Sequence, residues 1–263
     1  MDSLNNRTAL VTGASSGLGA EFARQLARRG CHLVLVARRA DALARIASEC
    51  ESQGVTVTVI SHDLSQTGAA DALHSDVQSR HIDVDILVNN AGFGVHGYFM
   101  SQPLARINDM LALNVVTLTQ LTQLFGRDMV ARGHGHILQV GSVGSFQPGP
   151  LYGAYAATKA YVLSLGEALA CELRGTGVTA TVVCPGVTAT EFLDSAGQDG
   201  KMSFYQKMVL MQADDVVRQG LEAMLAGRPA VVTGWLNKLQ ILALRLVSRR
   251  FAARAALWGM RLD

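Results

Sequence analysis

The chain has 263 residues, of which 49% are hydrophobic and 17% are charged, and its formal net charge is +2. This composition supplies enough apolar side chains for a large core and excludes an intrinsically disordered chain. A net charge this close to zero, with no concentrated basic stripe in the first 230 residues, argues against nucleic acid as a partner.

The N-terminal residues are polar, and the first apolar run, residues 9–11, is far too short for a signal peptide. No stretch approaches the roughly 20 apolar residues that a membrane span requires. The four cysteines have no Cys-x-x-Cys spacing, so we expect no metal site and free thiols in a reducing compartment. These observations predict a soluble, cytoplasmic protein.

Short runs rich in Val, Ile and Leu alternate along the chain with segments of helical periodicity. The runs show no apolar/polar alternation, which is typical of strands buried on both faces of a parallel sheet. Helix-length connections between them agree with that arrangement. The predicted strands are 8–11, 31–37, 55–60, 85–88, 136–140, 178–184 and 230–232, and the predicted helices are 18–29, 41–53, 69–79, 104–131 and 153–174.

The order of these elements predicts an α/β fold, a doubly wound Rossmann-type parallel sheet of about seven strands. No Pro- or Ser-rich linker interrupts the chain, so we expect one domain over residues 1–263. Two segments lie outside the repeating pattern: residues 188–212, which we interpret as a substrate lid, and residues 234–263, a basic amphipathic tail.

A glycine-rich turn, Thr12-Gly13-Ala14-Ser15-Ser16-Gly17-Leu18-Gly19, joins the first strand to the first helix. Glycines permit a tight turn and close approach of the backbone to a pyrophosphate, and the helix N-terminus offers free N–H groups to its charge. A ligand-free tight turn is the alternative, but the place of the motif in the first strand–helix unit favours a dinucleotide. The predicted contacts are Gly13, Ser15, Ser16, Gly17, Leu18 and Gly19.

The end of the second strand indicates which dinucleotide is bound. A site for NAD usually carries an acidic residue there, but this chain has Ala37, followed by Arg38 and Arg39. Arginine can bind a 2′-phosphate through paired hydrogen bonds. We therefore predict NADP(H), with Arg38 as the main contact and with Arg39 and Ser15 in support. A solvated arginine pair is the alternative; the nearest acid, Asp41, lies too far along the chain to reverse the prediction.

A tyrosine and a lysine begin the helix predicted over residues 153–174. Tyr155 and Lys159 are four residues apart, so they share one helical face. A nearby cation favours phenolate and lowers the pKa of a tyrosine, which makes the phenol a usable acid/base. Tyr152 is a competitor, but its i+4 residue is Ala156; a solvated helix face is the other interpretation of the pair.

Two further polar residues complete the predicted catalytic set. Ser142 follows the fifth strand, at the edge where open α/β sheets bind ligands, so its hydroxyl can stabilise charge on a substrate oxygen. It could instead cap a helix. Asn114 is unusual amid apolar residues in a helix, and it could bond a backbone carbonyl instead.

The turn spacing Gly-x-x-x-Gly-x-Gly, the segment Asn89-Asn90-Ala91-Gly92 and the Tyr-x-x-x-Lys pair resemble the short-chain dehydrogenase/reductase family, over about residues 7 to 192. The resemblance implies that Asn114 holds a water linking Lys159 to solvent, that Lys159 also bonds the nicotinamide ribose, and that the protein forms a homodimer or homotetramer. The asparagines could equally tie strand ends together. Further implied cofactor contacts are Asp63, Leu64, Asn90, Ala91, Gly92, Tyr155, Lys159, Pro185, Gly186, Val187, Thr188 and Thr190.

The predicted function is interconversion of a ketone or aldehyde and an alcohol by hydride transfer with NADP(H), and the expected partner is an apolar small-molecule carbonyl or alcohol substrate. A redox-sensing dinucleotide-binding regulator without turnover, a C=C reductase and an epimerase are the alternatives. The expected wall residues are Phe93, Val95, His96, Tyr98, Val143 and Gln147, together with Phe192, Leu193, Met202, Phe204, Tyr205 and Met208 of the lid, with Gly197 and Gly200 as its hinges.

The tail carries basic residues interleaved with apolar ones and has no acid before Asp263. Such a stretch can pack on the enzyme or on a neighbouring subunit, and it can bind a membrane surface. We favour packing and keep weak membrane contact as the alternative.

Overall fold

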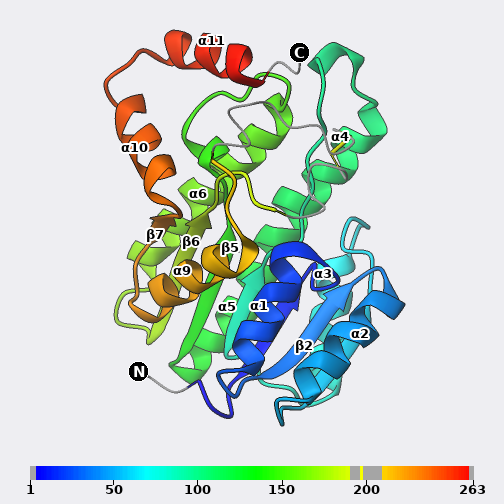
Figure 1. The fold of residues 1–263 in the computed structure, drawn as a ribbon. Coiled ribbons are helices and arrows are strands. Elements are labelled where there is room, and N and C mark those ends of the chain that lie inside the picture. The colour runs from blue at the N-terminus through cyan, green and yellow to red at the C-terminus, as the bar shows by residue number, and fades with distance from the viewer. Residues whose placement is uncertain (1–3, 190–195, 198–208, 261–263) are drawn as a thin grey trace.

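The computed structural model describes residues 4–189, 196–197 and 209–260. Its centre is one sheet of seven parallel strands in the order β3-β2-β1-β4-β5-β6-β7 (Figure 1), which confirms the predicted fold class. The strand order reverses between β1 and β4, the place where doubly wound sheets form a ligand crevice. The strands are Thr8–Thr12 (β1), His32–Ala37 (β2), Val57–Ser61 (β3), Ile86–Asn89 (β4), Gly135–Val140 (β5), Val178–Cys184 (β6) and Ala230–Val232 (β7).

Helices cover both faces of the sheet. One apolar cluster joins the sheet to α1, α2 and α9, and a second joins it to α3, α5 and part of α6. Ala9 and Val11 belong to the first cluster and Leu10 to the second, which explains why β1 shows no apolar/polar alternation. The helices are Gly17–Ala27 (α1), Ala40–Glu51 (α2), Ala69–Ser79 (α3), Leu104–Leu111 (α4), Leu118–Arg132 (α5), Gly153–Glu172 (α6), Ala213–Leu225 (α9), Trp235–Leu244 (α10) and Arg249–Met260 (α11).

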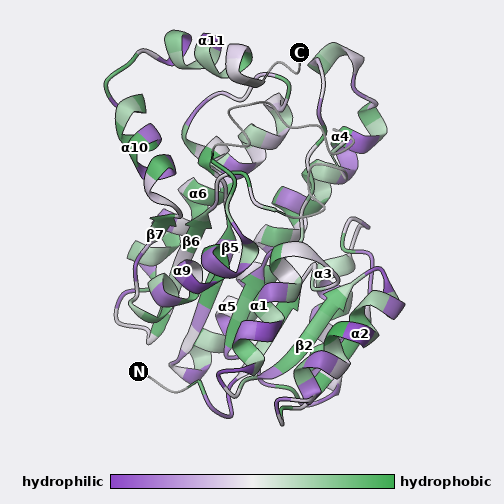
Figure 2. Cartoon of the chain, in the orientation of Figure 1, coloured by the Kyte–Doolittle hydropathy of each residue, from purple (hydrophilic) through white to green (hydrophobic). Residues whose placement is uncertain are grey.

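The hydropathy of the chain follows this layering. In Figure 2 the strands are green, whereas α1, α2 and α9 alternate green with purple, as helices do that bury one face and expose the other.

The long helix predicted over residues 104–131 is interrupted. Between α4 and α5 the backbone forms a π-helical turn, Ala112–Thr117 (η2), which contains Asn114. Periodicity alone did not reveal the interruption, because one widened turn scarcely disturbs the apolar pattern on either side. Such turns are frequently found at functional sites. Two short 3-10 turns, Phe99–Ser101 (η1) and Val143–Phe146 (η3), flank the same end of the sheet.

The C-terminal tail forms α10 and α11, which lie above the carboxyl ends of β6 and β7 in Figure 1. Within the described ranges, no helix has the length and apolar character needed to cross a membrane. Most of the predicted lid, including residues 190–195 and 198–208, lies outside the described part of the chain. Its two ends are tied together, because Thr188 forms an isolated parallel bridge with Met211.

Core truncation at Phe22 tests this packing. Phe22 is fully buried in the cluster that joins α1 to the sheet. We expect Phe22→Ala to lower the free energy of unfolding by about 3–5 kcal/mol, from lost burial and the cavity left behind. The measurement is urea unfolding followed by circular dichroism. Phe99→Ala, at an exposed position of η1, is the control, and its free energy of unfolding should stay within about 0.5 kcal/mol of wild type. Equal losses of stability in the two variants would contradict the burial of Phe22.

Candidate functional site

A cavity of about 920 Å³ opens at the carboxyl edge of the sheet, where the strand order reverses. Residues that directly follow successive strands line it: Gly13 after β1, Arg38 after β2, Asn90 after β4, Gly141 after β5 and Pro185 after β6. Parallel strands all end at this edge, so segments far apart in sequence reach one crevice.

The glycine-rich turn forms one wall of this cavity. Gly13 has a φ of +67°, and a Cβ there would lie 2.9 Å from the Cα of Ala91. A Cβ on Gly19 would collide with the carbonyl oxygen of Gly13. Of the predicted cofactor contacts in this turn, Gly13, Ser15, Ser16, Gly17 and Leu18 line the cavity. Gly19 is not among the described lining residues, and its lack of a side chain lets α1 pack against the turn.

Thr12 and Asn90 join the ends of β1 and β4. The Oγ1 of Thr12 accepts hydrogen bonds from the backbone N–H groups of Asn90 and Ala91, both at 3.0 Å. The Nδ2 of Asn90 donates to the carbonyl oxygen of Thr12 at 2.9 Å. Asn89 instead points to α5, where its Nδ2 donates to Thr122 Oγ1 at 2.9 Å. Both asparagines therefore connect elements, and Asn90 lines the cavity as well.

Two arginines stand at the end of β2. Ala37 closes the strand, and Arg38 and Arg39 both line the cavity. The Nη2 of Arg39 donates to Ser15 Oγ at 3.5 Å. Asp41 lies in the first turn of α2, exposed and not among the described lining residues.

Asp63 and Leu64, the implied adenine contacts, line the cavity beside these arginines. Burial raises the pKa of the Asp63 carboxyl, but hydrogen bonds from Ser65 and Gln66 and the charge of Arg38 outweigh that effect, so the pKa lies below its ordinary value. Asp63 therefore carries its negative charge at neutral pH.

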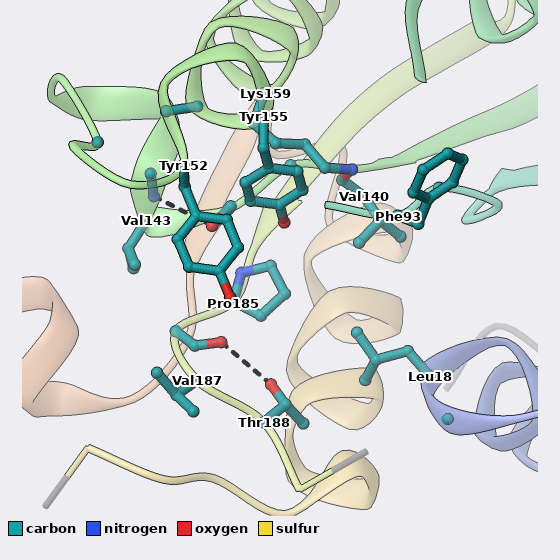
Figure 3. Close-up of a pocket in the computed structure, with 18 of the residues that line it drawn as sticks. Leu18, Phe93, Val140, Val143, Tyr152, Tyr155, Lys159, Pro185, Val187 and Thr188 are labelled. Atoms are coloured by element: carbon teal, nitrogen blue, oxygen red, sulfur yellow. Dashed lines mark hydrogen bonds between the residues drawn. The ribbon is translucent and has the colours of Figure 1, made fainter. Parts of the chain in front are cut away.

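Tyr155, in the first turn of α6, lies deep in the cavity (Figure 3), and its phenol is hydrogen-bonded to Ser142. Burial raises the pKa of the Tyr155 phenol to about 12, and the hydrogen bond to Ser142 offsets part of this rise. The sequence predicts a lowered pKa because of Lys159. In this structure the effect of burial on the Tyr155 pKa outweighs that of the lysine. The Lys159 Nζ lies 5.8 Å from the ring centroid, and burial also disfavours the positive charge of Lys159.

Lys159 is only 5% exposed, and its Nζ donates to the carbonyl oxygen of Val140 at 2.7 Å. Burial lowers the pKa of its amine to about 8. Beneath it, burial raises the pKa of the Cys184 thiol to about 12, so this cysteine is a neutral core residue.

Asn114 is buried in η2 behind the cavity and does not line it among the described residues. Its Oδ1 accepts from the backbone N–H of Phe93 at 3.2 Å. Its Nδ2 donates to the Phe93 carbonyl oxygen at 2.9 Å and to Thr158 Oγ1 at 3.2 Å. Asn114 thus fastens the segment after β4 to the helix that carries Tyr155 and Lys159, and Gly92 fits between them because a Cβ there would lie 2.9 Å from Asn114 Oδ1.

Ser142 is both a cap and a cavity residue. It caps η3 by accepting a hydrogen bond from the Gly144 backbone N–H at 3.0 Å, which is the alternative role weighed for it. It lines the cavity at the same time, beside Tyr155.

The other two tyrosines of this region differ in position. Tyr152 is buried against Tyr155, with ring centroids 5.9 Å apart, and burial raises its pKa strongly. Tyr161 bonds to Thr119 on the outer surface, 2.9 Å away.

The segment after β6 forms the wall opposite the glycine turn. Pro185, Gly186, Val187 and Thr188 all line the cavity, and Thr188 Oγ1 donates to the Gly186 carbonyl oxygen at 3.2 Å (Figure 3). Thr190 lies outside the described residues.

The expected substrate wall is partly wrong. Phe93, Val143 and Gln147 line the cavity, but Val95, His96 and Tyr98 are not among its described lining residues. The ring of His96 packs on the outer side of Tyr152, at 5.1 Å between centroids, and Tyr98 is exposed.

The C-terminal tail supplies wall residues that sequence reasoning missed. Asn237 is buried against Gly186, where a Cβ would lie 2.7 Å from its Oδ1. The helical spacing of Phe251, Ala255 and Trp258 was the available signal, but it does not say what the apolar face covers. The lining residues of the tail are Asn237, Gln240, Ala243, Leu244, Val247, Phe251, Ala252, Ala255, Ala256, Trp258 and Gly259.

The family model described as short chain dehydrogenase matches residues 7–201. The chain belongs to the short-chain dehydrogenase/reductase family. This confirms the resemblance drawn from its motifs, and with it an oxidoreductase family whose solved members hold NADP(H) or NAD.

Three members of the short-chain dehydrogenase/reductase family illustrate the similarity. The ketoacyl reductase HetN of Nostoc sp. is 34% identical over 186 residues, which span 71% of this chain but only 65% of that protein. A structure of a 7β-hydroxysteroid dehydrogenase has a TM-score of 0.87 at 26% identity, covering 97% of this chain and 99% of the other. A Sphingobium yanoikuyae member in complex with NADPH has a TM-score of 0.80 at 31% identity, covering 97% and 96%.

The buried amine of Lys159 predicts a pH dependence of stability. The native protein releases this proton near pH 8, whereas the unfolded chain keeps it up to the ordinary value of 10.5. The unfolded state therefore binds more protons within that window, so the contribution of Lys159 to stability rises with pH. Between pH 8 and pH 10.5, we expect the free energy of unfolding of wild type to rise by on the order of 3 kcal/mol relative to that of Lys159→Met.

Urea unfolding at pH steps through the window measures this difference. Lys238→Met removes an exposed lysine and is the control, which should show no such slope. A Lys159→Met profile parallel to wild type would contradict a lowered pKa of the buried Lys159 amine.

Proposed function

We propose that this protein is an NADP(H)-dependent oxidoreductase that interconverts a ketone or aldehyde and an alcohol. The observation that carries the proposal is the convergence of Ser142, Tyr155 and Lys159 on the cavity that the glycine-rich turn also lines. A regulator that binds a dinucleotide without turnover does not require a buried phenol and a buried amine at the cavity, so their presence favours an enzyme.

The residues present fit a dinucleotide. The turn at Gly13 leaves no room for a side chain, as a backbone that approaches a pyrophosphate requires, and the N-terminus of α1 follows directly. Asp63 and Leu64 would hold the adenine, and Pro185 to Thr188 the nicotinamide. When bound, NADPH supplies the hydride.

The choice of NADP(H) rests on the end of β2. Ala37 stands where a carboxylate would repel a 2′-phosphate, and Arg38 and Arg39 face the cavity. Paired N–H groups of a guanidinium match a phosphate in geometry and charge.

Ser142 and Tyr155 act on the substrate oxygen. Both hydroxyls donate hydrogen bonds to the carbonyl, which orients it and stabilises the negative charge that grows on it. Tyr155 is protonated at neutral pH, because burial holds its pKa high, and so it can donate its proton to the nascent alkoxide.

Lys159 supports the phenolate that this proton transfer leaves behind. Its Nζ lies 5.8 Å from the ring centroid of Tyr155. An amine with a pKa near 8 exchanges protons readily at neutral pH, so Lys159 can return one to Tyr155. A water held at Asn114 would complete the path to solvent; the side chain of Asn114 fixes the surrounding backbone for it.

The substrate is an apolar carbonyl compound. Val143, Phe251 and Trp258 form the wall on the substrate side, together with small and apolar residues of α10 and α11. The relatives named for ketoacyl and hydroxysteroid substrates agree with this class. A ketone and secondary-alcohol panel with NADPH and NADH in parallel identifies the substrate and separates the proposal from a C=C reductase or an epimerase.

We further propose that the enzyme is a cytoplasmic homodimer or homotetramer. Cys31, Cys50 and Cys184 are buried free thiols, as expected in a reducing compartment. Leu111, Val116 and other apolar residues on α4, η2 and α5 are exposed, which supplies a surface for a second subunit.

Replacing the phenol tests the catalytic assignment. We expect Tyr155→Phe to lower kcat by about 10²–10⁴-fold, because the proton donor is lost. Binding of NADPH, measured by its fluorescence, should stay near wild type. The neighbouring buried Tyr152→Phe is the matched control and should retain turnover within about tenfold. Near-normal turnover of Tyr155→Phe on every ketone reduced by wild type would contradict the role of Tyr155.

Removing one guanidinium tests the cofactor. We expect Arg38→Ala to raise the KM for NADPH by about tenfold or more and to leave the KM for NADH unchanged, since a charge-assisted hydrogen bond contributes about 1.5–3 kcal/mol. Steady-state kinetics with both cofactors measure this split. Arg45→Ala, on the exposed side of α2, is the control. An equal rise in the KM for NADPH and the KM for NADH would show that Arg38 does not bind the 2′-phosphate.

A further inference from the structure

Helix α10 is apolar on two opposite faces. Asn237, Ile241 and Leu244 face the cavity and the body of the protein. On the other side, Trp235, Leu239 and Leu242 of α10, and Leu246 two residues beyond its end, recur at the spacing of one helical stripe. They are exposed, Trp235 by 68% and Leu246 by 85%. We define these four residues as the outer stripe. A helix that is apolar on two opposite sides normally has a partner on each of them.

The surroundings of the outer stripe are strongly basic. Lys238 on α10 and Arg245 directly after it flank the stripe, and α11 adds three exposed arginines. The sequence contains no acidic residue between Glu222 and Asp263. Within the described residues, none of these cations forms an ion pair; they are Lys238, Arg245, Arg249, Arg250 and Arg254. The surface therefore combines apolar side chains with uncompensated positive charge.

The mouth of the cavity lies beside α11, the helix that carries three of these cations. Phe251 and Trp258 line the cavity and yet are 60% and 83% exposed, so they mark its rim. Figure 1 shows α11 above the carboxyl edge of the sheet. Apolar side chains of α11 thus border the opening.

The charge decides which partner this surface fits. A two-fold contact with a second copy would set arginine against arginine with no carboxylate nearby, which is unfavourable. An anionic lipid bilayer matches both features of this surface. Its hydrocarbon can contact the outer stripe, and its negative headgroups can pair with the cations. Trp235 and Trp258 have the amphipathic side chain that is enriched at membrane–water interfaces.

We propose that α10 and α11 dock the protein on the surface of an anionic lipid bilayer, without crossing it. The outer stripe and the rim residues enter the headgroup region, and the arginines contact lipid phosphates. The cavity mouth then faces the lipid. This docking depends on the tail surface alone and not on the proposed activity.

Co-sedimentation of the full chain with vesicles tests the proposal. We expect binding to vesicles of equal parts phosphatidylcholine and phosphatidylglycerol, weak or no binding to phosphatidylcholine alone, and loss of binding at high salt. The variant Arg245→Gln, Arg250→Gln, Arg254→Gln should weaken binding by about tenfold or more. The matched control Arg45→Gln, Arg127→Gln, Arg174→Gln changes net charge equally on other exposed surfaces and should bind as wild type does.

Tryptophan fluorescence reports on the same surface directly. The chain has two tryptophans, and both belong to the tail, Trp235 on α10 and Trp258 on α11. Anionic vesicles should shift their emission to shorter wavelength and protect them from acrylamide. Trp235→Phe and Trp258→Phe separate the two signals. Leu239→Ser with Leu242→Ser should reduce both the shift and the binding, and circular dichroism verifies that the variant is folded.

Three results would overturn the proposal. One is equal partitioning of wild type with anionic and zwitterionic vesicles. Another is equal loss of binding in the two triple-arginine variants, which would indicate a response to net charge only. The last is a tail-dependent dimer in sedimentation velocity, abolished by Leu239→Ser with Leu242→Ser, together with no vesicle binding; the outer stripe would then be a subunit interface.

Discussion

The hydrogen bonds that Thr12 and Asn90 exchange tie the end of β1 to the end of β4, at the point where the strand order reverses. At this reversal neighbouring connections leave the sheet toward opposite faces, so a crevice opens between them. The glycine turn forms one side of the crevice, and the segment after β6 forms another. The backbone ladder between β1 and β4 ends at Val11 and Val88, and the bonds between Thr12 and Asn90 extend the connection to the cavity edge of the sheet.

Burial then decides the protonation states in the crevice. A phenol and an amine that share a dry site each favour their neutral form, so the pKa of Tyr155 rises and that of Lys159 falls. Nearness of opposite charge alone would have predicted the reverse for the tyrosine. The resulting pair is a neutral acid beside a base that titrates close to physiological pH, which suits transfer of a proton to a carbonyl oxygen.

The two C-terminal helices, α10 and α11, contribute both to the cavity wall and to the exposed surface of the protein. One side of α10 holds Asn237 against Gly186, and α11 contributes Phe251, Ala255 and Trp258 to the cavity wall. The outward sides of the same helices carry apolar and basic residues. Two helices thus serve as cavity wall and as exterior patch, because a short helix of mostly apolar residues has more hydrophobic surface than the enzyme body can cover.

The amino-acid sequence by itself determined what depends on local spacing: the seven strands, the glycine turn, the absence of an acid after β2, and the shared helical face of Tyr155 and Lys159. These follow from short-range geometry, which repeats every two residues in a strand and every 3.6 in a helix. The sequence did not show that the edge strands β3 and β7 are only partly buried, because each has a neighbouring strand on one side only. Only the tertiary structure decided that Asn114 lies in a π-helical turn, that His96 packs against Tyr152 and is not among the described residues that line the cavity, and that α11 lines the cavity. An apolar helical face in the sequence predicts that another part of the protein covers it, but it does not identify that part. The partner is selected by contacts between residues far apart in the chain.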